Sequence, residues 1–124
     1  MQLLQHNVSS NRGSIVNTAS MAGIATPPNM IAYASSKAAL IAFTKVLSKE
    51  LGSFNIRVNA IAPGLTNTKM MGKDVSRKVI EEAIKRVALK RPAEPEEISD
   101  VVMFLGSDLS SYISGEVIFV TGGY

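Results

Sequence analysis

The sequence contains no cysteine and no tryptophan, and its 124 residues include a single histidine, His6. Without cysteine, the chain has no disulfide framework, thiolate metal site or cysteine nucleophile. A single histidine also excludes a metal site that needs two imidazoles and leaves little imidazole chemistry. Any catalysis must therefore rely on other side chains, chiefly hydroxyl groups, phenols and amines.

Long apolar runs are also missing, although hydrophobic residues make up 46% of the sequence and charged residues only 19%. This composition excludes an intrinsically disordered chain. No apolar run reaches the length of a membrane span, and the amino-terminal residues lack the pattern of a secretory signal. We therefore expect a soluble, cytoplasmic protein with no membrane partner, folded as a single domain over residues 1–124.

The charge balance is basic but not concentrated, with 13 lysines and arginines against 10 acidic residues. Binding to nucleic-acid phosphates requires a cluster of positive charge. The densest basic cluster, at residues 85–91, is followed at once by acidic residues at 94–97, and aromatic residues make up only 6% of the chain. We therefore expect no nucleic-acid partner and interpret the basic residues as a solvated surface or an attraction for an anionic ligand.

Short apolar runs alternate with helical patterns along the chain, while Gly23 and Pro27-Pro28 mark a loop. The expected elements are a strand at 14–20, a helix at 31–51, a strand at 56–62, helices at 75–88 and from 95 onward, and a strand at 117–120. Helical crossovers between strands are typical of a parallel sheet with helices on its faces. The order β-α-β-α-α-β therefore predicts an α/β fold.

Helical periodicity assigns an apolar face to each of these helices. In the long helix the apolar stripe is Leu40, Phe43, Leu47 and Leu51, with Ala34, Ala38 and Ala42 on the other side and Gly52 at the expected cap. In the later helices the apolar residues are Val79, Ile80, Ala83, Ile84 and Val87, and then Ile98, Val101, Val102 and Leu105. The alanine side is small enough for a second helix to approach closely.

Tyr33 and Lys37 lie one turn apart on the predicted long helix, so their side chains project from the same face. An ammonium group near a phenol favours its ionised form, which suits Tyr33 to proton transfer near neutral pH. The pair alone is weak evidence, because this spacing also arises by chance. A surface tyrosine stacked on a lysine stem is the simpler interpretation of the pair by itself.

Polar residues also follow the first two predicted strands. Ser20 ends the first strand, and Pro63-Gly64 ends the second, with Thr66 and Thr68 close behind. Ligands of open parallel sheets bind at the carboxyl ends of the strands, where a Ser20 hydroxyl would reach a substrate oxygen. Glycine allows close approach of the backbone, and successive amides and hydroxyls bind a carboxamide or phosphate. The simpler alternative is that Ser20 only starts a turn.

Together these segments resemble the carboxyl-terminal half of a short-chain dehydrogenase/reductase of the ketoacyl-reductase-like type. The matching segments lie at residues 13–23, 33–39, 56–64, 95–98 and 113–115. The resemblance covers nearly the whole chain, and the order and spacing of the segments make it specific. It implies the carboxyl-terminal half of an NAD(P)-binding, Rossmann-type doubly wound parallel sheet.

The resemblance also implies an enzyme that transfers a hydride between the nicotinamide of NAD or NADP and a small-molecule carbonyl or alcohol, as in 3-oxoacyl reduction. Tyr33 would then be the general acid/base, Lys37 would assist it and bind the nicotinamide ribose, and Ser20 would polarise the carbonyl. The nicotinamide carboxamide and the neighbouring phosphate would be bound by Pro63, Gly64, Thr66 and Thr68.

Several parts of the family pattern are absent from this sequence. No glycine-rich phosphate-binding turn occurs, and the residue that selects NAD or NADP is missing with it. The family's catalytic asparagine has no counterpart either, because Asn17 lies on the first predicted strand and not on the preceding helix. Because a dinucleotide needs its pyrophosphate held at a helix N-terminus, the alternative is that this chain alone is inactive, as a fragment, a pseudo-enzyme or one piece of a split protein.

The resemblance further implies a dimer or tetramer, formed through the long helix and through the last helix and strand. The missing half of the sheet would lie beside the first predicted strand. We therefore expect that strand to expose an unpaired edge, which favours pairing with another chain.

Overall fold

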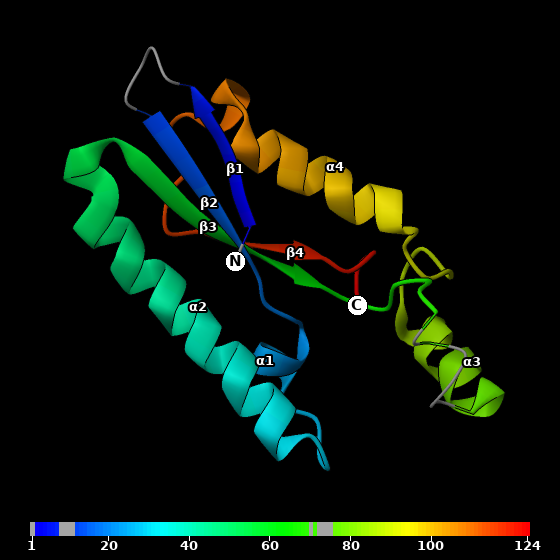
Figure 1. The fold of residues 1–124 in the computed structure, drawn as a ribbon. Coiled ribbons are helices and arrows are strands. Elements are labelled where there is room, and N and C mark those ends of the chain that lie inside the picture. Colours follow the sequence, from blue (N-terminus) through cyan, green and yellow to red (C-terminus); the bar gives the residue numbers. More distant parts are fainter. Residues whose placement is uncertain (1, 8–11, 70, 72–75) are drawn as a thin grey trace.

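The computed structural model describes residues 2–7, 12–69, 71 and 76–124, which form a four-stranded sheet flanked by helices (Figure 1). The elements are β1 (Gln2–Asn7), β2 (Arg12–Thr18), α1 (Ala22–Ala25), α2 (Ile31–Leu51), β3 (Ile56–Pro63), α3 (Arg77–Arg86), α4 (Pro95–Gly106) and β4 (Val117–Val120). Single 3-10 turns follow α2 and α4. Among the helices described, none is long and apolar enough to cross a membrane.

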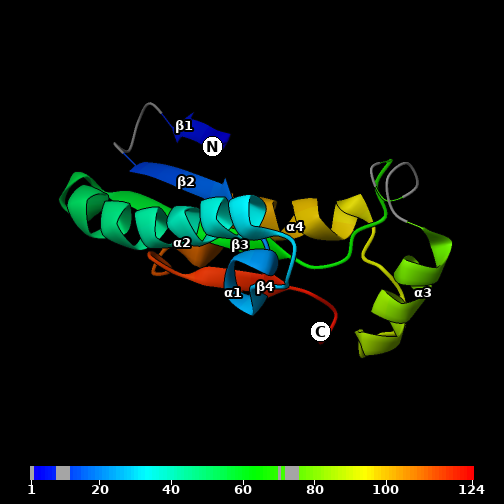
Figure 2. The same cartoon turned by 90° about the horizontal axis from the view of Figure 1, so that it is seen from below.

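The sheet has the strand order β1-β2-β3-β4, and its last three strands are parallel. Val16 of β2 and Ile61 of β3 pack with Leu105 of α4 in a buried core. Successive residues of a strand point to opposite faces of the sheet, so Asn17 lies on the face opposite to Val16. On that face the Asn17 side chain donates a hydrogen bond to Thr44 of α2. The sheet therefore lies between α2 and α4, and the predicted parallel α/β architecture is confirmed (Figures 1 and 2).

The structure contains two elements that the sequence pattern did not predict, β1 and the four-residue helix α1. β1 pairs antiparallel with β2, from Gln2 opposite Val16 to Asn7 opposite Arg12. The prediction that the first predicted strand, β2, exposes a free edge is therefore wrong. The free N–H and C=O groups of an edge strand can pair with any extended segment. An antiparallel neighbour such as β1 needs only a short connection to reach that edge.

Helix α2 has the predicted bounds, and its predicted inner face is confirmed in part, because Leu40, Leu47 and Leu51 are half-buried. Phe43 is 47% exposed, whereas Ala34 and Thr44 are buried. Gly23 of α1 lies against the backbone of Ala38, so a second helix does approach closely on the alanine side. Gly52 keeps a right-handed conformation, and Asn55, with φ of 59°, supplies the left-handed residue after the helix.

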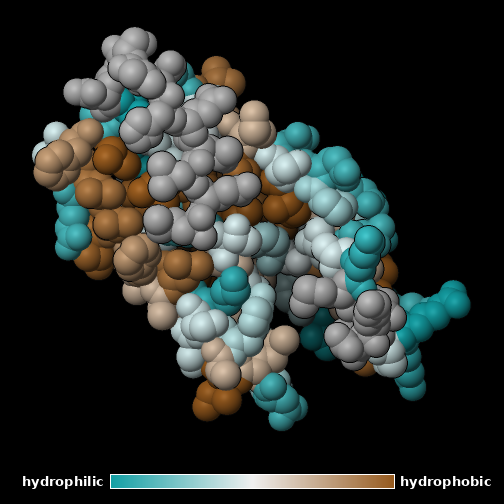
Figure 3. Space-filling view, in the orientation of Figure 1, coloured by the Kyte–Doolittle hydropathy of each residue, from teal (hydrophilic) through white to brown (hydrophobic). Residues whose placement is uncertain are grey.

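The two later helices behave differently from each other. The predicted inner face of α4 is confirmed, because Ile98, Val101 and Val102 pack with Leu105 against the core. The predicted inner face of α3 is confirmed in part, because Val87 is buried and Ile80, Ala83 and Ile84 are half-buried, but Val79 is 57% exposed. α3 lies at the far end of the molecule from β1 in both ribbon views. Hydrophobic residues gather where α2 and the sheet lie, and hydrophilic residues cover α3 and the outer side of α4 (Figure 3).

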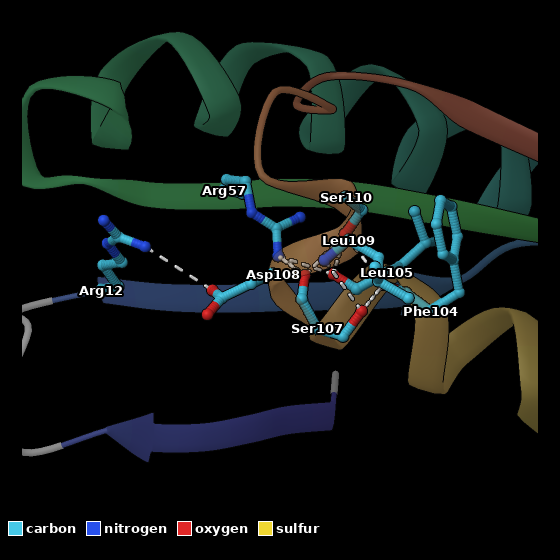
Figure 4. A network of polar contacts seen from close by, with 8 residues as sticks. All are labelled: Arg12, Arg57, Phe104, Leu105, Ser107, Asp108, Leu109 and Ser110. Carbon is cyan, nitrogen blue, oxygen red and sulfur yellow. Dashed lines mark hydrogen bonds and ion pairs between the residues drawn. The ribbon is translucent and has the colours of Figure 1, made fainter.

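Arg57 of β3 holds the carboxyl end of α4 (Figure 4). Its guanidinium donates hydrogen bonds to the carbonyl oxygens of Leu105 and Ser107, at 2.9 and 3.0 Å. Asp108 lies beside this contact and pairs with Arg12 at 3.7 Å. Burial lowers the pKa of Arg57, and the Asp108 carboxylate opposes this shift. Arginine stays protonated nonetheless, so a cation faces the negative end of the α4 dipole.

Candidate active site

Ser20 lies just beyond β2, at the carboxyl end of the parallel strands. The segment stays tied to β3, because Ala19 N donates to Ile61 O at 2.8 Å and Met21 N donates to Pro63 O at 3.1 Å. The Ser20 hydroxyl accepts a hydrogen bond from Ala22 N at 3.2 Å. Ser20 therefore begins the turn into α1 and lies beside Pro63, as expected from the strand ends.

Lys37 joins helix α2 to the same end of β2. Its ammonium donates to the backbone oxygen of Thr18 at 2.9 Å and lies 5.7 Å from the centroid of the Tyr33 ring. That separation is within the range of a cation–π contact, about 6 Å. Tyr33 is 46% exposed. The structure thus brings Tyr33 and Lys37 to the strand end that carries Ser20.

Gly23 allows α1 to lie directly against α2. A Cβ atom at Gly23 would lie 2.8 Å from Ala38 N and 2.8 Å from the carbonyl carbon of Lys37. These are backbone atoms, so they cannot rotate away as a side chain would. The sequence pattern marked Gly23 only as a chain breaker. Its close contact fixes the turn after Ser20 against the backbone of Lys37.

The segment from Pro63 to Thr68 begins at the last residue of β3, at the same carboxyl end of the parallel strands. Gly64 N donates to Val120 O at 3.0 Å, and a Cβ atom at Gly64 would lie 3.1 Å from the Cα of Thr121. The Thr66 hydroxyl donates to Gly64 O at 3.2 Å. Thr68 is exposed. Within the described part of the chain, no hydrogen bond joins Thr66 or Thr68 to Ser20, Tyr33 or Lys37.

A buried polar pair lies between β2 and α2, close to these residues. Asn17 Nδ2 donates to the Thr44 hydroxyl at 2.9 Å, and that hydroxyl donates to Leu40 O at 2.8 Å. In the sequence, Asn17 stands out only as a residue that does not match the family's catalytic asparagine. An asparagine inside an apolar strand was the signal that could have identified this contact, because buried amides need partners.

The hydrogen-bond donors at the carboxyl ends of the parallel strands fit the nicotinamide-nucleoside end of a dinucleotide. Lys37 uses one N–H on Thr18 and keeps two for ribose hydroxyls, and the exposed Tyr33 leaves its own hydroxyl available. A pyrophosphate needs a glycine-rich turn at a helix N-terminus, which this sequence does not contain. No cluster of metal-ligating side chains occurs among the residues that the structure describes.

Comparison with known proteins identifies the family. The family model described as enoyl-(acyl carrier protein) reductase matches residues 1–124. The 3-oxoacyl-[acyl-carrier-protein] reductase of Thermotoga maritima is 45% identical over 121 residues, which cover 98% of this chain and 49% of that protein. The chain belongs to the short-chain dehydrogenase/reductase family. The sequence-based family prediction is therefore confirmed.

Relatives in this short-chain dehydrogenase/reductase family differ in substrate. The 3alpha-hydroxysteroid dehydrogenase of Mediterraneibacter gnavus is 44% identical over 110 residues, covering 89% of this chain and 44% of that protein. A 3-oxoacyl-[acyl-carrier-protein] reductase of Brucella melitensis with bound NAD superimposes with a TM-score of 0.83 at 41% identity, covering 94% of this chain and 42% of that one. The chain spans about half the length of the curated relatives it matches.

Proposed function

We propose that this chain is the carboxyl-terminal half of an NAD(P)-binding Rossmann domain and carries the proton-transfer part of a reductase or dehydrogenase site. The reaction would interconvert a carbonyl and an alcohol on a small molecule of the 3-oxoacyl type. One observation carries the proposal. The Lys37 ammonium contacts both the Thr18 carbonyl oxygen and the Tyr33 ring, at the strand end where Ser20 begins its turn.

Each of these side chains has a distinct chemical role in the proposal. The Tyr33 hydroxyl gives or takes the proton at the substrate oxygen, and the Ser20 hydroxyl donates to the same oxygen and orients it. The Lys37 ammonium lies 5.7 Å from the centroid of the Tyr33 ring, and its two remaining N–H groups bind ribose hydroxyls. When bound, the nicotinamide supplies or accepts the hydride.

The strand end at β3 supplies the second part of the proposed cofactor contact. Gly64, Thr66 and Thr68 would bind the nicotinamide carboxamide and the neighbouring phosphate, with Pro63 fixing the turn. The hydrogen bond from Met21 N to Pro63 O supports this, because it holds the segment next to the Ser20 turn. The groups that choose between NAD and NADP are not encoded in this sequence.

Replacing Tyr33 by phenylalanine tests the role of the phenol. In the assembled enzyme, Tyr33→Phe removes the proton donor but keeps the ring, so turnover falls by about 10²- to 10⁴-fold. Cofactor affinity stays nearly unchanged, and both quantities follow from NAD(P)H oxidation measured over a range of cofactor concentrations. Tyr112→Phe, at a fully exposed tyrosine, is the matched control. Normal carbonyl reduction by Tyr33→Phe would show that the assignment is wrong.

A second candidate is that this chain alone is catalytically inactive, as a fragment or one piece of a split protein. Its length relative to its relatives and the missing glycine-rich turn favour this reading. Titration with NADH and NADPH, followed by nicotinamide fluorescence, separates the two. Micromolar binding by the isolated chain contradicts the inactive fragment, whereas no change in fluorescence supports it.

The proposed protein also self-associates as a dimer or tetramer. The outer surface of α2 supports this, because Ile31, Phe43 and Val46 are 85%, 47% and 55% exposed on a single helix. Apolar side chains gathered on one surface are typical of a protein–protein interface. A cytoplasmic location stays a prediction.

A further inference from the structure

The contact between β2 and α2 contains a polar pair in otherwise apolar surroundings. Asn17 is 1% exposed and Thr44 is fully buried. The Asn17 amide donates to the Thr44 hydroxyl at 2.9 Å. The alternation of the strands places apolar Ile15 and Ala60 on the same face of the sheet. A polar pair at this place needs an explanation.

Stability does not supply that explanation. The Oδ1 atom of Asn17 is buried and has no hydrogen-bond partner among the described residues. A buried acceptor without a partner lowers the stability of the fold, and replacing both members of such a pair by apolar groups of similar shape is often neutral or favourable. Departures of this kind are expected where a structure must meet a functional requirement.

The Asn17–Thr44 pair fixes the relative position of β2 and α2. Apolar contacts allow a helix to shift or rotate on a sheet with little penalty, whereas a hydrogen bond joins one strand residue to one helix residue. Thr44 lies about two turns after Lys37 on α2, and Asn17 directly precedes Thr18 on β2. The Asn17–Thr44 and Lys37–Thr18 bonds therefore join the same helix to the same strand at two separated points.

We propose that Asn17 and Thr44 are positioning residues for the candidate active site. Their hydrogen bond sets the position of α2 along β2 and its rotation about its own axis. This placement brings the Lys37 ammonium to the Thr18 carbonyl oxygen and Tyr33 to the end of β2 near Ser20. The catalytic consequence rests on the proposed function, whereas the placement of Lys37 is a property of the chain itself.

Three variants separate positioning from stability. Thr44→Val keeps the shape of the side chain but removes its hydroxyl, whereas Thr44→Ser keeps the hydroxyl. Asn17→Leu combined with Thr44→Val removes the whole pair, including the unpartnered oxygen. Each variant is examined by urea unfolding and by nitrogen-15 NMR of the Lys37 ammonium. The hydrogen bond to Thr18 slows exchange of this group with water, and its signal is assigned by its loss in Lys37→Gln.

We expect Thr44→Val to lose the slowly exchanging Lys37 signal and Thr44→Ser to keep it. The double variant unfolds at a urea concentration at least as high as that of the native chain, yet also lacks the signal. A double variant that keeps the Lys37 signal would overturn the proposal. A double variant that is as destabilised as Thr44→Val, with no recovery in Thr44→Ser, would also overturn it, since the pair would then serve stability alone.

The assembled enzyme separates this proposal from the proposed function. There, Thr44→Val is expected to lower kcat while leaving the KM for the cofactor nearly unchanged, and Thr44→Ser is expected to restore kcat. If the Lys37 signal is lost in Thr44→Val while kcat stays native, the positioning of Lys37 is supported and its proposed catalytic role is wrong.

Discussion

Gly23, which packs against α2, and Gly52, which directly follows α2, differ in the space available for a side chain. A Cβ atom at Gly23 would lie 2.8 Å from backbone atoms of Lys37 and Ala38, whereas a Cβ atom at Gly52 would meet nothing within 4 Å. Gly52 also has a helical φ of −58°. The first glycine is therefore required by packing, while the second is replaceable by any residue that favours a helix.

The pair of substitutions Gly23→Ala and Gly52→Ala tests this difference. Gly23→Ala forces two backbones apart and is expected to lower the free energy of unfolding by about 1–3 kcal/mol. Gly52→Ala restricts the unfolded chain without strain and is expected to raise it by about 0.4–1 kcal/mol. Urea unfolding followed by circular dichroism measures both. Equal effects of the two substitutions would show that α1 does not depend on close contact with α2.

Among the elements, α4 has the most complete polar cap. Glu97 accepts a hydrogen bond from Glu94 N at 2.8 Å, and the Arg91 guanidinium donates to its two oxygens at 2.6 and 2.7 Å. The pKa of Glu97 is lowered to about 2, chiefly by the hydrogen bond from Arg91 and then by that from Glu94 N. These contacts join the segment before α4 to its first turn, as a capping box does.

This cap predicts a dependence of stability on pH. Because folding lowers the pKa of Glu97, the ionised carboxylate stabilises the folded chain fully above its unfolded value, about 4.3, and this contribution is lost as the pH falls toward 2. The difference in unfolding free energy between the native chain and Glu97→Gln is therefore expected to shrink over that range. Urea unfolding at several pH values measures it, with Glu96→Gln as the control.

The elements also show where sequence patterns are sufficient. The bounds of α2 and β4 match the predictions because a long periodic helix and a β-branched run are encoded locally. Helix α1 has only four residues, too short for a periodicity, and forms where Gly23 meets α2. Phe43 was assigned to the inner face by spacing alone and is 47% exposed, whereas Leu40, Leu47 and Leu51 of the same predicted stripe are half-buried.

At the scale of the whole molecule, the outer surface of α2 bears on the proposed self-association. Val46 on α2 and Val79 on α3 are 55% and 57% exposed, so the two valines have nearly the same exposure but lie on different helices. If α2 forms the interface, a charge at Val46 is desolvated on association, whereas a charge at Val79 stays in solvent. This pair of valines therefore isolates the contribution of the interface.

Light scattering of Val46→Lys and Val79→Lys tests the α2 interface. The native chain and Val79→Lys are expected to show the mass of a dimer or tetramer, and Val46→Lys a smaller species. Circular dichroism confirms that both variants remain folded. A native chain that is strictly monomeric would exclude self-association, and an unchanged mass for Val46→Lys would place the interface elsewhere.

The amino-acid sequence was sufficient to identify the family, the succession of parallel strands and helices along the chain, and the candidate residues Ser20, Tyr33 and Lys37. These features follow from residue types at fixed spacings along the chain. Three contacts became known from the fold alone: Lys37 donates to the carbonyl oxygen of Thr18, Gly23 contacts α2, and β1 pairs with the edge of β2. Each of these contacts involves backbone atoms on at least one side. Backbone groups are the same in almost every residue type, so no pattern of residue types marks the contacts in advance.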